Sequence, residues 1–334
     1  MKNTVTRRSW LKSSGAALAS LAAAGILPES ARGSSTPAGA SKVLMTKKIT
    51  PESLVKIYEA LGRPASGRVA VKISTGEPGG HNFLQPSLIG DLVRKVNGTI
   101  VECNTAYGDA AGGVRDHTES HRKLLQEHGW TKYFDVDLMD AEGPDVVWPI
   151  PNGKVLKENH VGKHILHYDS MLVLAHFKGH PMGGYGGALK QLAIGCASRA
   201  GKALIHSAGK TDDRFKTWEQ HASSVVFPEA MADAASSVIE HFRGKIAFIN
   251  VMKNLSVDCD CCAVAEDPCM NDVGILSSLD PVALDRACID LVINSNDPGR
   301  DHFMERVNSR HGTHTIDSAE TLGIGTQAYE LVKV

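Results

Sequence analysis

The chain has 334 residues, with 36 Lys and Arg against 37 Asp and Glu, which gives a formal net charge of −1 at pH 7. This balance excludes the broad basic field of a nucleic-acid-binding protein, and aromatic residues at 5% provide few platforms on which bases could stack. We therefore expect no nucleic-acid partner. The length suits one large domain or two closely packed ones.

The N-terminal segment has the features of an export signal. Residues 6–12 read TRRSWLK, a twin-arginine pattern, and an Ala-rich apolar run follows from Ala16 to Leu27. The run is too short for a membrane span, and its charged start suits a cleaved signal. We expect residues 1–31 to be read by the twin-arginine translocase and 32–43 to be a flexible linker. The mature protein would be periplasmic or otherwise extracytoplasmic, with no stable membrane span; the alternative is an amphipathic first helix.

From residue 44 onward, helical and extended patterns alternate. Predicted helices cover 51–61, 86–96, 114–128, 188–197, 228–242 and 281–293. Predicted strands cover 68–74, 99–104, short stretches near 134 and 146, then 171–177, 245–251 and 273–276. The continuous apolar run 171–177 is the best candidate for a central strand. This order predicts an α/β fold over residues 44–334, with a mostly parallel sheet and helices on both faces.

Ligands of an open parallel sheet collect beyond the carboxyl ends of its strands, and three polar segments lie at such positions. They are residues 75–82, 105–115 and 178–190. The third reads KGHPMGGYGGALK, in which Gly183, Gly184, Gly186 and Gly187 let the backbone approach a ligand closely. No Walker motif and no dinucleotide fingerprint is present, so a nucleotide cofactor is not indicated.

The start of the next helix, at Ala188, offers backbone N–H groups to an anion. Lys190 adds a positive charge there, and His180 is a candidate ligand or general acid/base. The segment therefore predicts a pocket for a small, anionic molecule. The alternative is a tight strand-to-helix crossing that needs glycine only for packing.

The other histidines give weaker indications. His176, in an apolar strand, is typical of a core residue. The set at 160, 164 and 167 has helix-like spacing and is typical of a solvated face. The pair at 117 and 121 has a spacing that can hold a metal, but it does not match the zinc-protease order.

Four of the seven cysteines lie within eleven residues, in a loop at 258–270 that begins DCDCCAVAEDPC. Thiolates at such spacing in a polar loop serve a metal or a redox couple. We expect Cys259, Cys261, Cys262 and Cys269 to form a metal centre, either an iron–sulfur cluster or a single iron or zinc ion. The alternative is one or two disulfides formed after export.

Two long motifs resemble the DUF362 family, whose members are often described as uncharacterised iron–sulfur centre proteins. They are KGHPMGGYGGALKQLAIGCASRAGK at 178–202 and the segment that runs from NLSVDCDCC to DRACIDLV. NTAYG at 104–108 and the helix ending QEHGW add to the resemblance, which extends from about residue 44 to the C-terminus. It implies an iron–sulfur centre. Many members carry a ferredoxin-like module with CxxCxxCxxxCP runs, which has no counterpart here, so electron transfer through that module is not implied.

Three functions remain open from the sequence. The first is an exported metal- or iron–sulfur-binding protein with a redox or metal-assisted enzymatic role, using the Gly-rich segment as its ligand pocket. The second is a non-catalytic periplasmic binding protein for an anionic small molecule, with the cysteines as structural disulfides. The third is a cofactor-free hydrolase or lyase with His180 as its base.

Overall fold

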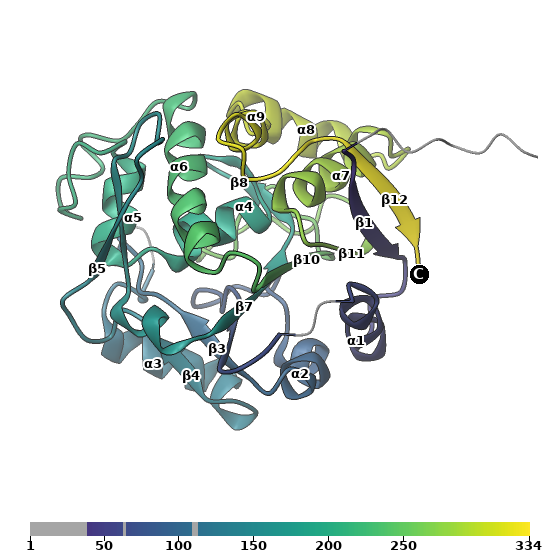
Figure 1. Ribbon diagram of the computed structural model, residues 1–334, viewed down its shortest axis with the longest axis horizontal. Coiled ribbons are helices and arrows are strands. Elements are labelled where there is room, and N and C mark those ends of the chain that lie inside the picture. The colour runs from purple at the N-terminus through teal and green to yellow at the C-terminus, as the bar shows by residue number, and fades with distance from the viewer. Residues whose placement is uncertain (1–38, 63–64, 109–112) are drawn as a thin grey trace, which may run out of the picture. The chain divides into compact units, whose positions relative to one another are not determined.

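The computed structural model describes residues 39–62, 65–108 and 113–334 (Figure 1). The expected export signal, residues 32–38 of the expected linker, and residues 109–112 of the second strand-end segment lie outside this description. In the described part, no helix has both the length and the apolar character that crossing a bilayer requires.

One large sheet organises the described chain. Its strands, in spatial order, are β12 (Tyr329–Lys333), β1 (Ser41–Thr46), β11 (Gly274–Ser278), β10 (Ile246–Met252), β7 (Ser170–His176), β2 (Val69–Lys72), β3 (Gly98–Glu102) and β4 (Val136–Leu138). β11 is antiparallel to both of its neighbours, and the other five pairings are parallel. Every residue of β7 and β10 is buried, as expected for central strands of a parallel sheet. The predicted α/β fold with a mostly parallel sheet is confirmed.

Helices cover both faces of this sheet (Figure 1). On one face lie α1 (Pro51–Ala60), α2 (Pro86–Lys95), α3 (Thr118–Glu127) and the short η2 (Trp130–Lys132). On the other lie α4 (Ala188–Lys190), its π-helical continuation η4 (Gln191–Gly195), α5 (Arg199–His206), α6 (Val226–His241), α7 (Pro281–Ile293), α8 (Arg300–Ser309) and α9 (His314–Thr321). Two hairpins, β5 (Val146–Pro149) with β6 (Glu158–Val161) and β8 (Lys178–His180) with β9 (Gly184–Gly186), complete the described fold together with the 3-10 segment η3 (Lys163–His167).

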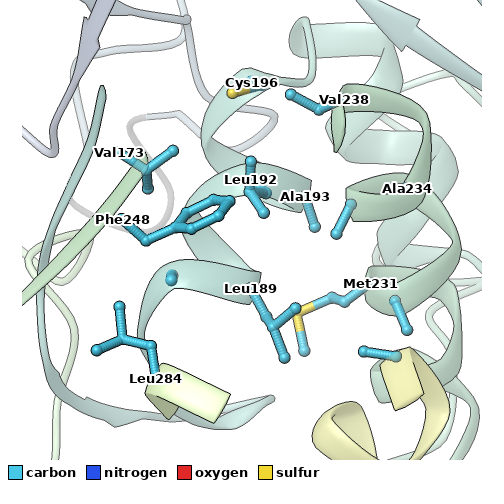
Figure 2. Packing of buried hydrophobic residues seen from close by; sticks show 14 of the residues in the cluster. Val173, Leu189, Leu192, Ala193, Cys196, Met231, Ala234, Val238, Phe248 and Leu284 are labelled. Carbon is cyan, nitrogen blue, oxygen red and sulfur yellow. The ribbon is translucent and has the colours of Figure 1, made fainter. Parts of the chain in front are cut away.

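Alternation along the central strands creates two cores. Val173 on β7 and Phe248 on β10 face Leu192 and its neighbours, which fill the space between the sheet and α6 (Figure 2). The residues that alternate with them along each strand, such as Leu172 on β7, belong to the second core with α1 and α2. Because successive strand side chains point to opposite faces, one apolar run supplies both cores.

The helix starts follow the expected local chemistry. Thr50 accepts a hydrogen bond from the Ser53 N–H at 3.2 Å, and proline occupies the first turn of α1. Asp280 caps α7 in the same way, accepting from Val282 and Ala283 at 2.9 and 3.0 Å. These caps explain why both helices begin where the sequence predicts.

Other expected elements differ from the structure. The helix expected from residue 114 begins at Thr118, because the backbone N–H of Val114 and the side chain of Arg115 bond to the carboxylate of Glu77. The three histidines at 160, 164 and 167 do not share a helix face, since the first lies in β6 and the others in η3. α5, α8, α9, β1, β12 and the hairpin of β8 and β9 were not predicted.

The carboxyl ends of β2, β3, β7 and β10 lie at one edge of the sheet, because these strands run in the same direction. The sequence identified the segments that follow β2, β3 and β7 as candidate ligand sites. The Cys-rich loop 258–270 follows β10, the fourth strand of this set. The fold therefore brings the cysteines to the same edge as the Gly-rich segment.

Candidate metal centre

The cysteine loop and the Gly-rich segment meet at His180. The Sγ atoms of Cys259 and Cys261 and a ring nitrogen of His180 all lie within 4.8 Å of one another, and Cys261 Sγ is 3.9 Å from His180 Nε2. A tetrahedral ion with one thiolate and one imidazole ligand separates them by about 3.6 Å, given the usual bond lengths. The three side chains are therefore placed so that they could hold a metal ion.

The remaining two predicted ligands are placed differently. The Cys262 N–H donates to the Cys259 carbonyl at 2.9 Å, which closes a tight turn. The Cys262 thiol forms a hydrogen bond with the Cys261 thiol. Cys269 stands outside the group, with its thiol donating to the Leu255 carbonyl at 3.3 Å. The structure brings the sulfurs of Cys259 and Cys261 together with His180, while Cys262 contacts Cys261 without joining that group and Cys269 lies apart from it. All seven cysteines lie in described segments and are free.

Lys190 reaches this group from α4. Its Nζ lies 3.6 Å from Cys259 Sγ. Burial alone would lower the pKa of Lys190, but the neighbouring thiols of Cys259 and Cys261 raise it above its ordinary value. The lysine therefore stays charged and stabilises a thiolate at Cys259.

The protonation pattern of His180 is fixed by the Gly-rich segment. Its Nδ1 accepts hydrogen bonds from the backbone N–H groups of Gly183, at 2.8 Å, and Met182, at 3.2 Å. Both partners are donors, so the lone pair sits on Nδ1 and the neutral ring carries its proton on Nε2. Burial, then the charge of Lys190, lowers the pKa of His180 to about 4, so the ring is neutral at pH 7. In this form Nε2–H donates toward Cys261 rather than binding a metal, and His180 does not suit the role of base.

His206, at the end of α5, has the opposite arrangement. Its Nδ1 lies 2.7 Å from the Lys202 carbonyl, which can only accept, so Nδ1 carries the proton and Nε2 keeps a lone pair. Burial lowers the pKa of His206 to about 4. The sequence did not indicate this residue, because no helix was predicted over 199–206.

A buried ion-pair network adjoins the site. Arg115 bonds to Glu77 at 2.7 Å and to Glu102 at 3.3 Å, and Lys72 bonds to Glu102 at 2.7 Å. Burial alone would raise the pKa of Glu102, but Lys72 and Arg115 lower it to about 2. Two cations and two anions therefore balance within the network.

Two neighbouring cavities with a shared wall adjoin these residues. The wider one has a volume of about 630 Å³ and is lined by Pro181, Met182, Trp218, Cys261, Cys262 and Val264 among others. A smaller chamber of about 60 Å³ lies against Cys259, Arg115, Gln191, Lys190 and Lys202. His180, His206, Tyr107 and Cys261 line both. A molecule in the wider cavity would thus contact the sulfurs of Cys261 and Cys262, and the chamber lies on the other side of the shared residues.

The four predicted glycines do not line either cavity. The first N–H groups of α4, on Ala188 and Leu189, donate to the carboxylate of Asp285 at 2.8 and 3.0 Å. The positive helix end predicted to bind an external anion is already bound to a carboxylate of this chain. A Cβ on Gly187 would meet the same carboxylate at 2.5 Å, and one on Gly184 would meet Gly312 at 2.7 Å. Here glycine permits close packing, which was the alternative interpretation.

A second group that could hold a metal consists of Asp137, His164 and His167. Asp137 is already bonded to His164, at 2.7 Å, and to the Tyr168 hydroxyl, at 2.8 Å. His176, as expected, is a satisfied core residue, bonded to Asp260 at 2.8 Å. Its other ring nitrogen bonds to the carbonyl of Lys253.

The family comparison agrees with the motifs. Residues 69–290, about two thirds of the chain, match the family described as "Domain of unknown function (DUF362)". The chain belongs to the DUF362 family. The match includes the Gly-rich segment and all four cysteines of the loop, so the candidate site lies within the DUF362 region.

Two solved structures are only weakly similar to this chain. The lactate racemase apoprotein from Thermoanaerobacterium thermosaccharolyticum is 14% identical with a TM-score of 0.37, over 64% of this chain and 51% of that one. A protein from Thermotoga maritima is 12% identical with a TM-score of 0.36, over 81% of this chain and 58% of that one. This DUF362 chain thus spans between half and three fifths of their lengths. No curated protein matches it.

Proposed function

We propose that the protein is a metal-dependent enzyme in which Cys259, Cys261 and Cys262 bind one thiophilic metal ion at the wall of a small-molecule pocket. The observation that carries the proposal is the meeting of the Cys259 and Cys261 sulfurs with His180, beside Lys190, at the carboxyl edge of the parallel strands. Cys262 follows Cys261 directly in the chain and is proposed as the third ligand. Thiolates are the ligands preferred by zinc, iron and other soft ions.

A single ion fits this donor set better than a cluster. Iron–sulfur clusters take four cysteine ligands, and the fourth cysteine of the loop, Cys269, bonds to a backbone carbonyl instead. Three cysteine ligands would leave one position of a tetrahedral ion open. Cys261 and Cys262 line the wider cavity, so that position would face a bound molecule.

The surrounding residues have separate tasks in this proposal. Lys190 and the Nε2–H of His180 donate to the sulfurs and hold them as thiolates. His206 presents a lone pair in the same cavity and can accept a hydrogen bond from a bound molecule. The ion, when bound, polarises an oxygen or lowers the pKa of bound water.

The test is the metal content of anaerobically purified protein. We expect about one equivalent of metal, and we expect its loss in the Cys259→Ser/Cys261→Ser double variant, because Ser is a poor ligand for soft metals at neutral pH. Cys269→Ser is the matched control from the same loop and should keep the metal. Full metal in the double variant would place the site elsewhere. A metal-free wild type with a Cys259–Cys261 disulfide would favour the binding-protein alternative.

We further propose that this centre is loaded before export. The twin-arginine pattern at residues 6–12 supports this, since that route carries folded proteins and would deliver the protein to the periplasm with its metal in place.

A further inference from the structure

The smaller chamber contains a positive charge that the described residues do not neutralise. Its charged lining consists of Arg115, Lys190 and Lys202 against Glu102. Arg115 is balanced within the buried network by Glu77 and Glu102. Lys190 lies against Cys259 Sγ, so Lys202 remains, and a buried charge without a partner is expensive unless a ligand compensates it.

Lys202 is nearly buried, with 5% of the residue exposed. Among the described residues, its ammonium donates only to the Ala197 carbonyl, at 2.7 Å. Among the described residues, no carboxylate lies within 4.0 Å of it. An ammonium has three donors, so two are left for a group inside the chamber.

Gln191 supplies a further donor on the same wall. Its Nε2 is buried and has no hydrogen-bond partner in the described part of the chain. The side chain lines the chamber beside Lys190. An orphan amide donor next to two cations is the arrangement that an oxyanion satisfies, since each carboxylate oxygen accepts two hydrogen bonds.

Size and polarity define the rest of the ligand. A water needs about 10–15 Å³ of such volume, so a chamber of about 60 Å³ admits a group the size of a carboxylate and little more. The wider cavity lies on the other side of the shared histidines, and its wall is apolar at Pro181, Met182 and Trp218. Val264, 93% exposed, stands at the same wall.

We propose that the protein binds a monocarboxylate with an apolar tail, holding the carboxylate between Lys202 and Gln191 in the chamber and the tail against Met182 and Trp218. This inference rests on the proposed function, because it places the substrate of the same site past the sulfurs. It moves the predicted anion site away from the start of α4, which Asp285 occupies, to the side chains of Gln191 on η4 and Lys202 on α5.

The experiment measures calorimetric binding of 4-phenylbutyrate, 4-phenylbutan-1-ol, acetate and inorganic phosphate to the full-length protein, with and without a chelator. We expect 4-phenylbutyrate to bind at least tenfold more tightly than the alcohol or acetate. Lys202→Met should weaken it at least tenfold, and Gln191→Leu about threefold or more. Lys157→Met is the matched control, because that ammonium also donates to one carbonyl but on the surface, and its affinity should not change.

Equal affinity for the acid and the alcohol would overturn the proposal, as would an unchanged affinity in folded Lys202→Met and Gln191→Leu proteins. Tighter binding of inorganic phosphate would overturn the choice of a carboxylate. Metal content is measured in the same samples. Carboxylate binding that survives the chelator supports the chamber even if no metal is found, whereas metal without carboxylate binding supports the centre alone.

Discussion

Lys190 Nζ lies 3.6 Å from Cys259 Sγ, and this contact joins two segments that the sequence placed in separate roles. The lysine was expected to bind an external anion, and the cysteine to bind a metal. In the structure the ammonium of Lys190 contacts the sulfur of Cys259. The charge of Lys190 lowers the pKa of the Cys259 thiol and so opposes burial and the hydrogen bond to Cys261, which raise that pKa above its usual value.

Lys190→Met should therefore change the chemistry of Cys259. Removing the cation raises the pKa of that thiol, which hydrogen bonding to Cys261 and burial already hold above its usual value. In reduced, chelator-treated protein at pH 8, we expect iodoacetamide to alkylate Cys259 about tenfold more slowly, as measured by peptide mass spectrometry. Lys190→Arg keeps the charge and should react at nearly the wild-type rate. Equal rates in the two variants would contradict the contact.

The Gly-rich segment should behave as a packing device. Gly184→Ala adds a Cβ 2.7 Å from Gly312 at a residue with φ of +76°, whereas Gly323, with φ of +72°, has open space around it. Both alanines incur strain of about 1 kcal/mol from the left-handed backbone, but only the first also overpacks, by about 1–3 kcal/mol. Chemical denaturation should show Gly184→Ala to be the less stable variant. Equal stabilities would mean that the hairpin is not tightly packed against the loop before α9.

His121 should make the protein sensitive to acid. Burial, then the charge of Arg115, lowers the pKa of His121 to about 3 from an ordinary value of 6.5. Between these values the unfolded chain binds the proton and the folded chain does not, so stability falls as the pH drops from 6.5 toward 3. The single-site effect is on the order of 3–5 kcal/mol. His121→Gln should flatten this part of the curve of unfolding free energy against pH; an unchanged curve would assign the acid sensitivity to other groups.

Export should depend on the arginine pair. Replacing both Arg7 and Arg8 with lysine keeps the charge but removes the feature that the translocase reads. We expect the precursor to accumulate in the cytoplasm, as judged by fractionation and immunoblotting. If the variant reaches the periplasm like the wild type, export occurs by another route, and the case for loading the metal before export is lost.

Features that depend on neighbouring residues were predicted well. Each of three features depends only on residues close in sequence: the cap formed by Thr50, the cap formed by Asp280 and the apolar run of β7. The residues of each segment therefore suffice to predict its helix or strand. The helix at 114–128 was placed too early because its first residues bond to Glu77, 37 and 38 positions away. α5 was missed, and with it Lys202 and His206, which now line the site.

By itself, the sequence determined the alternation of helices with the central strands, the mostly parallel sheet that this alternation requires, and the presence of four close cysteines. Only the tertiary structure decided which groups meet. His180 is 81 positions from Cys261, and Asp285 is 97 from Ala188, so no local pattern indicates that one donates to a sulfur and the other covers a helix end. The tautomers of His180 and His206 likewise follow from backbone groups whose positions the fold sets. Such contacts depend on how parallel strands align their ends, and that alignment is a property of the packed sheet.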